Sequence, residues 1–360
     1  MANTQTLSSR ERVHLALEHR ETDRIPIAMV CSGINPPAWR ELEAYLQRER
    51  GIDVQNYLDG FIDIRSVEPA YVGPPLGPGK DIWGVRRKAV SYGEGSYDEI
   101  VHYPLANLQT VSDLDDLRWP STDWFDYTTL PDRIAVLQAD GEHCIMVANG
   151  NIFETSWYMR GFEQMFMDFV LNPELAQAIM TRVTDFYVAH FRNMLAAAPG
   201  QIDLAFTADD IGGQNGLLMS LDMWETMIKP HHVRLNRAIH DFGTKVIYHT
   251  DGAVMDAVSG LIDMGIDVLQ ALQFSAKGMD PQKIKDGYGD RLCFEDGVSV
   301  QTTLPFGSAE DVRCEVEELI AVLGKGGGYI LGPSHAVQAG TPPENIVAMF
   351  DTALSFYPFT

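Results

Sequence analysis

The chain has 360 residues, of which 45% are hydrophobic and 21% are charged, as is typical of a globular protein with a sizeable core. Its 27 basic residues are outnumbered by 50 acidic ones, and the formal net charge of −23 makes nucleic acid and anionic membranes poor partners. The four cysteines lack metal-like spacing, and neither an apolar signal segment nor an apolar run of membrane-spanning length is found, so we expect a cytoplasmic protein.

The first part of the chain predicts two helices and two strands. Ser8–Glu18 has the apolar spacing of an amphipathic helix with a serine cap, and Ile25–Val30 follows it as a short apolar strand. Trp39–Arg48 is a second predicted helix, and Phe61–Val67 is a second predicted strand.

Residues 69–140 are too many for an ordinary loop of a compact domain. Within them, Asp81–Val90 and Tyr97–Tyr103 alternate in polarity and predict a hairpin, while Leu108–Leu117 and Thr129–Ala139 predict helical turns. We therefore predict an insertion after the second strand that caps the catalytic face.

From residue 140 onward, short apolar strands alternate with amphipathic helices. The predicted strands are Cys144–Ala148, Ile202–Thr207, Lys245–His249, Val268–Leu272, Leu292–Phe294 and Tyr329–Leu331. The predicted helices are Phe162–Asn172, Pro173–Ala197, Leu221–Phe242, Val254–Met264, Pro281–Tyr288, Ala309–Leu323 and Pro343–Phe356. Such alternation implies parallel β-α-β units, and eight strands close a barrel. A doubly wound sheet is disfavoured because no G-x-G-x-x-G follows the first strand, so we expect one α/β domain, a (β/α)₈ TIM barrel over residues 1–360.

Polar residues gather where these strands end, and a barrel brings the carboxyl ends of all its strands to one face. The stretch Lys245–Gly252, K-V-I-Y-H-T-D-G, ends in His249 and Asp251, which point to the same side of an extended chain. They are suited to bind a divalent metal, with His335 after the last strand as a third ligand. Acid–base chemistry at His249, a helix cap by Asp251 and a purely structural His335 remain alternatives.

Other strand ends supply candidate catalytic and substrate-binding groups. Asp209 and Asp210 point in opposite directions on an extended chain, so that one faces the pocket while the other caps a turn. Glu295 is either a catalytic carboxylate or part of the turn Glu295-Asp296-Gly297. We expect catalytic roles for Asp209, Asp210 and Glu295, and substrate contacts from the amides Asn151, Gln214, Gln273 and Gln338.

Several stretches together resemble the uroporphyrinogen decarboxylase-like superfamily, which includes corrinoid-dependent methyltransferases. They are Arg10–Pro26, Asp81–Val85, Tyr103–Leu105, Asp209–Gln214, His249–Gly252, Asp267–Gln273, Gly328–Gln338 and Pro342–Asn345. The resemblance implies a single barrel with its site at the carboxyl face. True uroporphyrinogen decarboxylases hold their substrate carboxylates with an arginine-rich motif after the first strand, whereas Met29–Pro37 here contains no arginine.

The methyltransferase branch typically binds zinc through H-x-C on the fifth strand and through a later cysteine. This chain has His249-Thr250-Asp251 at the first place and at best His335 or Ser334 at the second. An imidazole and carboxylate set suits oxygen donors such as aryl methyl ethers, and thus O-demethylation. Asp209, Asp210 and Glu295 are candidates for the acid that assists the leaving group.

The resemblance also implies the partners of the reaction. The expected enzyme moves a methyl group from a small methylated substrate to the cobalamin of a separate corrinoid protein, with zinc as its metal. A homodimer is left open as its assembly. The alternative is a decarboxylase that acts without a cofactor on uroporphyrinogen or another carboxylic acid, in which an aspartate or histidine protonates the carbanion.

Overall fold

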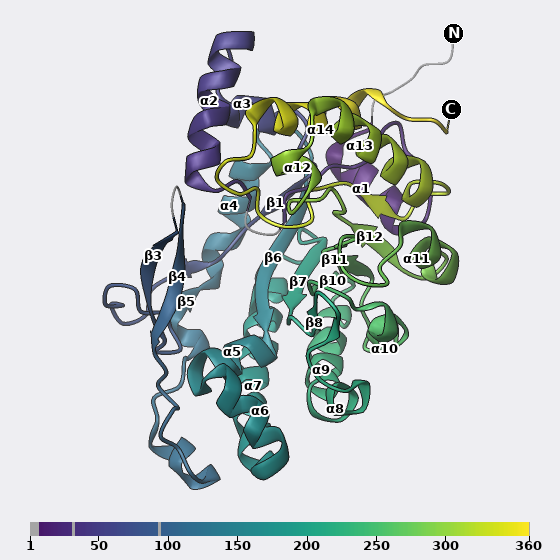
Figure 1. The fold of residues 1–360 in the computed structure, drawn as a ribbon. Coiled ribbons are helices and arrows are strands. Elements are labelled where there is room, and N and C mark those ends of the chain that lie inside the picture. The colour runs from purple at the N-terminus through teal and green to yellow at the C-terminus, as the bar shows by residue number, and fades with distance from the viewer. Residues whose placement is uncertain (1–6, 31–32, 93–94, 360) are drawn as a thin grey trace.

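The computed structural model describes residues 7–30, 33–92 and 95–359 (Figure 1). In these residues seven parallel strands form the main sheet, in the order in which they follow one another along the chain: β1 (Ile64–Ser66), β6 (Cys144–Asn151), β7 (Leu204–Ala208), β10 (Lys245–His249), β11 (Val268–Gln270), β12 (Cys293–Glu295) and β13 (Tyr329–Ile330).

The predicted first strand closes this sheet into a barrel. Ile27 forms a parallel bridge with Leu331, just after β13. On its other side, the carbonyl of Ile27 accepts a hydrogen bond of 2.8 Å from the backbone N–H of Asp63, just before β1. The eight predicted strand positions therefore surround one axis, and the prediction of a (β/α)₈ barrel is confirmed.

Helices surround the sheet (Figure 1). They are α1 (Ser9–Leu17), α2 (Pro36–Arg50), α3 (Val54–Asp59), α4 (Leu130–Leu137), α5 (Ile152–Arg160), α6 (Phe162–Leu171), α7 (Pro173–Ala197), α8 (Leu221–Met227), α9 (Lys229–His240), α10 (Val258–Asp263), α11 (Pro281–Tyr288), α12 (Thr303–Phe306), α13 (Ala309–Leu323) and α14 (Pro343–Ser355). The predicted helix Leu221–Phe242 is divided at Ile228, because Pro230 lacks the N–H needed to continue α8 and instead lies in the first turn of α9. Across the described residues, no helix combines the length and apolar character needed to cross a membrane.

Helix α1 closes the amino-terminal end of the barrel. Its start is fixed by a capping box in which Ser8 and Glu11 each accept a backbone N–H of the other. Its Val13 and Ala16 join an apolar cluster to which the strands contribute Ala28, Ile64, Cys144, Met146, Leu204, Ile247, Val268, Cys293 and Ile330. Because alternate side chains of a barrel strand point inward, this cluster fills the interior below the polar strand ends.

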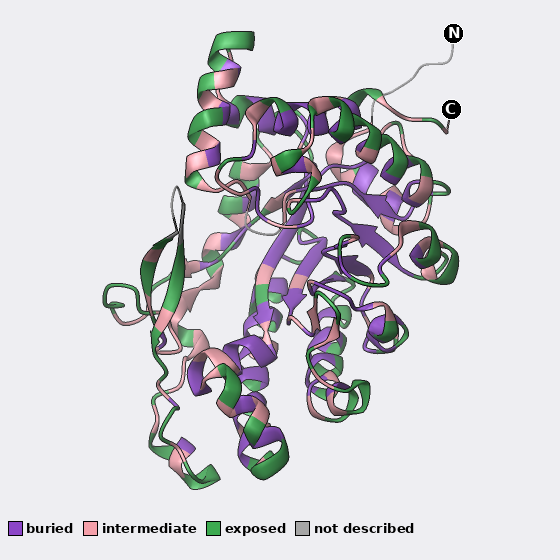
Figure 2. Cartoon of the chain, in the orientation of Figure 1, coloured by how far each residue is buried: buried purple, intermediate pink, exposed green. Residues whose placement is uncertain are grey.

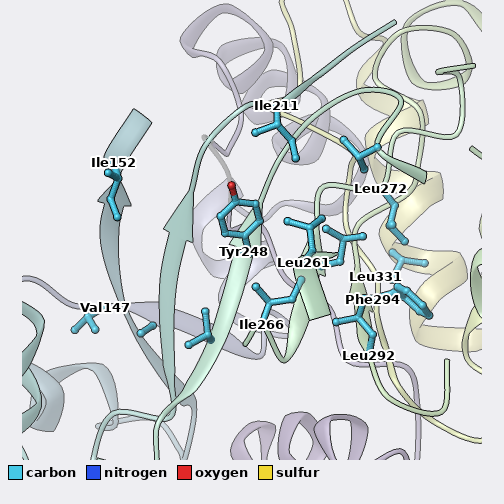
Figure 3. Close-up of a cluster of buried hydrophobic side chains, with 14 of the residues drawn as sticks. Val147, Ile152, Ile211, Tyr248, Leu261, Ile266, Leu272, Leu292, Phe294 and Leu331 are labelled. Atoms are coloured by element: carbon cyan, nitrogen blue, oxygen red, sulfur yellow. The ribbon is translucent and has the colours of Figure 1, made fainter. Parts of the chain in front are cut away.

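A second apolar layer separates the strands from the surrounding helices. Figure 3 shows Tyr248, Phe294 and Leu331 of the sheet beside Ile211 and Leu261, and all of these side chains are buried. In Figure 2 the strands of the main sheet are buried along most of their length, while the β3–β4 hairpin and the outer surfaces of the helices are exposed. Buried ionisable side chains lie at both ends of the strands: Asp63 and Asp203 precede β1 and β7, while His249 and Glu295 end β10 and β12.

The segment between β1 and β6 contains short elements that stand beside the barrel. β2 (Ala70–Tyr71) pairs with β5 (Phe125–Asp126), and β3 (Arg86–Tyr92) pairs with β4 (Gly95–His102) in a hairpin, at the left of Figure 1. The 3₁₀ turns η1 (Val111–Asp116), η2 (Thr122–Trp124) and η3 (Tyr127–Thr129) precede α4.

The predicted hairpin begins later than expected. Residues 81–85 form a loop because the carboxylate of Asp81 accepts backbone N–H groups of Trp83 and Val85, at 2.9 and 3.0 Å. Two residues of the expected turn, 93 and 94, lie outside the described residues.

Candidate functional site

His249 is the last residue of β10 and lies at the centre of the carboxyl face. Its Nδ1 lies 2.5 Å from Oε1 of Gln270, the last residue of β11, and Nε2 of Gln270 donates to Oδ2 of Asp296 at 2.6 Å. An amide oxygen only accepts hydrogen bonds, so Nδ1 of His249 carries a proton, and in the neutral form of the ring the lone pair is on Nε2. Gln270 thus orients the imidazole as the outer partner of a metal-binding histidine does.

Two carboxylates lie in front of this lone pair. One potential ligand atom from each of His249, Asp210 and Asp251 lies within 4.8 Å of the others. Oδ1 of Asp210 is 3.6 Å from Nε2 of His249 and also accepts the backbone N–H of Asp251 at 2.9 Å. Asp210 follows β7 and Asp251 follows β10, so adjacent strands of the barrel bring the two loops together. We call these three residues the acidic triad.

The structure places the third predicted metal residue at the edge of this group. Nε2 of His335 is 3.8 Å from Oδ2 of Asp251, and the rings of His335 and His249 have centroids 6.4 Å apart. The predicted set of His249, Asp251 and His335 is therefore gathered in one place, and Asp210, whose Oδ1 is 3.6 Å from Nε2 of His249, lies there as well.

The acidic triad carries more negative than positive charge. Burial would lower the pKa of His249, but the charges of Asp251 and Asp210 outweigh it and raise that pKa. Burial also raises the pKa of Asp251, and the negative charge of Asp210 raises it further. The positive charges of His249 and His335 lower it, but by less. A divalent cation would relieve this repulsion, and one imidazole with two carboxylates is a donor set that zinc accepts. The residues present thus fit a metal ion.

Asp209 lies away from the acidic triad, although it is the neighbour of Asp210. Its carboxylate is buried and accepts the backbone N–H groups of Phe153 and Glu154, both at 2.7 Å, at the start of α5. It also lies 2.5 Å from Nε2 of His232. Asp209 therefore caps a helix and pairs with a buried histidine, and the structure does not bring this predicted catalytic residue to the mouth of the barrel.

Glu295 is enclosed within the barrel. It is fully buried, and among the described residues neither of its carboxyl oxygens has a hydrogen-bond partner. Burial, and then the charge of Asp296, raise its pKa well above the ordinary value. Burial likewise raises the pKa of Asp296 to about 8. The predicted catalytic residue Glu295 is thus closed off from the surface and is not part of the triad.

Glu154 at the start of α5 was not predicted as a site residue. Its carboxylate accepts Nδ2 of Asn151 at 2.7 Å and the hydroxyl of Tyr158 at 2.9 Å. Burial raises its pKa to about 7, and the charges of Asp210 and Asp209 contribute. The sequence contained little to indicate it, because α5 itself was not predicted.

The remaining predicted residues are divided between two cavities and an exposed turn. Gln273 and Gln338 line a cavity of about 300 Å³ next to Asp251 and His335, which we call the mouth pocket. Asn151 lines a second cavity of about 390 Å³ between the insertion, α5 and α7, which we call the side pocket. Gln214 is exposed in the turn between β8 (Gly212–Gly213) and β9 (Gly216–Leu217), and it lines neither pocket.

The chain is similar to proteins of a known family. The family described as Uroporphyrinogen decarboxylase (URO-D) matches residues 89–356. A uroporphyrinogen decarboxylase of Alkalilimnicola ehrlichii is 23% identical over 269 residues, covering 70% of this chain and 68% of that protein. Another, from Anaeromyxobacter dehalogenans, is 25% identical over 201 residues, and the match covers 55% of this chain and 53% of that protein.

Among solved structures, a methyltransferase from Methanosarcina mazei has the same fold. It superimposes with a TM-score of 0.69 at 17% sequence identity, covering 98% of this chain and 99% of that chain. At this identity the likeness shows the fold alone. The family match, in contrast, spans most of the chain, so the chain belongs to the uroporphyrinogen decarboxylase (URO-D) family.

Proposed function

We propose that the chain is a methyltransferase that moves a methyl group from a small methylated substrate, such as an aryl methyl ether, to the cobalamin of a separate corrinoid protein. The observation that carries the proposal is the convergence of His249, Asp210 and Asp251 within 4.8 Å at the carboxyl face. The fold shared with a methyltransferase supports it.

The residues of the site have separate roles in this proposal. His249, Asp210 and Asp251 would hold zinc, with His335 beside them. When bound, zinc would supply a Lewis acid that stabilises the charge on the oxygen that loses its methyl group. Gln270 keeps the lone pair of His249 directed toward the carboxylates. Glu154, whose pKa burial raises to about 7, can give or take a proton near Asp210 at neutral pH.

The second candidate function is decarboxylation without a cofactor. It is favoured by the two relatives named uroporphyrinogen decarboxylase, and Asp251, which lines the mouth pocket, would be the group that carries a proton to the carbanion. It is disfavoured because the described residues that line the mouth pocket include no lysine or arginine to bind several substrate carboxylates.

Metal analysis of the full chain, purified without chelator, tests the assignment of the triad. We expect about one zinc ion per chain, lost in His249→Ala and reduced in Asp210→Asn, because each change removes a ligand. In Gln270→Leu the affinity for zinc should fall by roughly 10- to 100-fold, since the orientation of His249 is lost. His240→Ala, which changes a histidine at the end of α9 instead, is the matched control.

Methyl transfer from methoxyarenes to added cob(I)alamin, followed by its absorption spectrum, tests the reaction itself. Transfer by the wild type and its loss in His249→Ala would support the proposal. If every preparation of the protein lacked zinc, the assignment of His249, Asp210 and Asp251 as metal ligands would be wrong. Turnover of uroporphyrinogen would instead establish the second candidate.

A further inference from the structure

The side pocket is walled by aromatic rings that have no part in the acidic triad. The insertion contributes Trp83 and Phe125, and α7 contributes Phe186, Tyr187 and His190. The volume of about 390 Å³ is large enough for a substituted benzene ring.

The rings of the side pocket pack against each other into one wall. The centroid of Trp83 lies 5.1 Å from that of Phe186 and 5.6 Å from that of Tyr187. Phe125 lies 4.5 Å from His190, and the rings of Phe186 and His190 are stacked at 5.4 Å. A continuous wall of this kind offers edges and faces for a further planar ring, because aromatic pairs prefer offset or edge-to-face contacts.

The charges of the side pocket do not suit a polyanion. Its charged lining residues are Glu68, Asp81 and Arg87, which leave one acid in excess. Arg87 is already engaged, since it pairs with Asp81 at 2.8 Å and lies 4.8 Å from the ring centroid of Tyr158. A neutral ligand therefore fits this lining better than a substrate with several carboxylates.

One end of the side pocket is polar and adjoins the candidate site. Asn151 and Tyr158 both line the pocket, and both donate hydrogen bonds to Glu154. The charge of Asp210 acts on Glu154 and contributes to its raised pKa. Asn151 has a second amide N–H to donate and the hydroxyl oxygen of Tyr158 can accept, so this end can bind both ether and hydroxyl substituents of a ring.

We infer that the side pocket binds a neutral, planar aromatic ring, with the oxygen substituents of that ring at the end formed by Asn151 and Tyr158. The assignment of the ring to the methyl donor rests on the proposed function, whereas binding of the ring does not require methyl transfer. The pocket would thus select aromatic over aliphatic donors.

Isothermal titration calorimetry on the full chain, freed of metal, tests the inference with three probes. These are 2-methoxyphenol, methoxycyclohexane as a non-planar ligand of similar size, and tetramethylammonium as a ligand for a cation cage. We expect 2-methoxyphenol to bind about tenfold more tightly than methoxycyclohexane, since ring contacts add to apolar burial. Equal binding of these two, or preference for tetramethylammonium, would overturn the inference.

Two variants test whether the ring binds in the side pocket. Ala148→Leu adds bulk to a half-buried lining residue, and Trp83→Leu removes part of the wall, so each should weaken 2-methoxyphenol binding by about tenfold or more. Trp39→Leu, in a separate cavity of about 420 Å³, is the matched control and should leave binding unchanged. Circular dichroism melting curves verify folding, and unchanged binding in a folded Ala148→Leu variant would contradict the assignment.

The two proposals fail separately. If the aromatic ring binds but no assay detects methyl transfer, the side pocket is still a site for aromatic rings and the proposed function is wrong. Methyl transfer from an aromatic donor at an undiminished rate by a folded Ala148→Leu variant would remove the side pocket alone.

Discussion

Asp209 and Asp210 are adjacent in the chain, but their side chains have different surroundings. Asp209 is fully buried, and its carboxylate holds two backbone N–H groups of α5 and the ring of His232. Asp210 is partly exposed and lies in the acidic triad. Because alternate residues of an extended chain point in opposite directions, one strand end supplies both a structural carboxylate and a carboxylate of the acidic triad.

Substitution of each aspartate should therefore affect a different property. Asp209→Ala leaves buried donors unpaired and should lower the free energy of unfolding by about 3 kcal/mol. Asp210→Ala should change it by less than about 1 kcal/mol, because the group is partly solvated. Urea unfolding measures these effects, and titration with zinc should show at least about a tenfold loss of affinity for Asp210→Ala. Loss of stability in Asp210→Ala with a stable Asp209→Ala variant would contradict these assignments.

At the scale of elements, the loop that carries Asp251 packs tightly against β8. A Cβ atom on Gly212 would lie 2.3 Å from the backbone oxygen of Asp251. Gly252 has φ of +87°, a conformation that favours glycine, and a Cβ there would lie 2.7 Å from the oxygen of Gly213. The position of the Asp251 carboxylate thus depends on two glycines that permit close backbone contact.

The variant Gly212→Ala should displace this loop and weaken zinc binding by about tenfold or more, since a ligand is moved by a few tenths of an ångström or more. Gly213→Ala is the matched control, because its Cβ would have only an ordinary contact of 3.4 Å with Leu218. Equal zinc affinities of the two variants would show that the packing of β8 does not position Asp251.

The elements that could be predicted from the sequence are those with local end signals. Pro281–Tyr288 was predicted to the residue, and in the structure Asp280 caps it by accepting the N–H of Lys283, with Pro281 in the first turn. Helix α5 was missed because its own N-cap residue makes no side-chain cap, and Asp209 from a distant strand end supplies one. A helix cap that comes from a distant part of the chain leaves no signal in the sequence around the helix.

The sequence predicted part of the candidate site, as it predicted part of the fold. Strand alternation placed His249 and Asp251 together, and the fold brings His335 beside them. Gln270 was missed because β11 ends there, two residues earlier than predicted, so its side chain was counted within the strand. The sequence predicted Asp210 as a catalytic acid and not as a residue close to the imidazole of His249. This contact arises because the closed barrel brings the loops after β7 and β10 together, which the sequence pattern does not indicate.

For the molecule as a whole, two buried histidines couple stability to pH. Burial lowers the pKa of His190 to about 4, and Nδ1 of this residue accepts the hydroxyl of Tyr127 at 2.7 Å. Burial likewise lowers the pKa of His231 to about 4, where the ring lies between Thr184 and Gln177. Because His190 belongs to α7 and Tyr127 to the insertion, protonation would weaken the attachment of the insertion to the barrel.

The stability of the protein should therefore fall in mild acid. An unfolded histidine has a pKa of about 6.5, so between pH 6.5 and 4 the unfolded chain binds more protons than the folded one. The contribution of His190 is fully present above the unfolded pKa and is lost as the pH falls toward 4, by about 2 kcal/mol between pH 7 and pH 5. In His190→Asn the amide oxygen can still accept the Tyr127 hydroxyl but does not titrate. Urea unfolding at both pH values should show the smaller loss in this variant, and equal losses in the two proteins would mean that His190 is not protonated on unfolding.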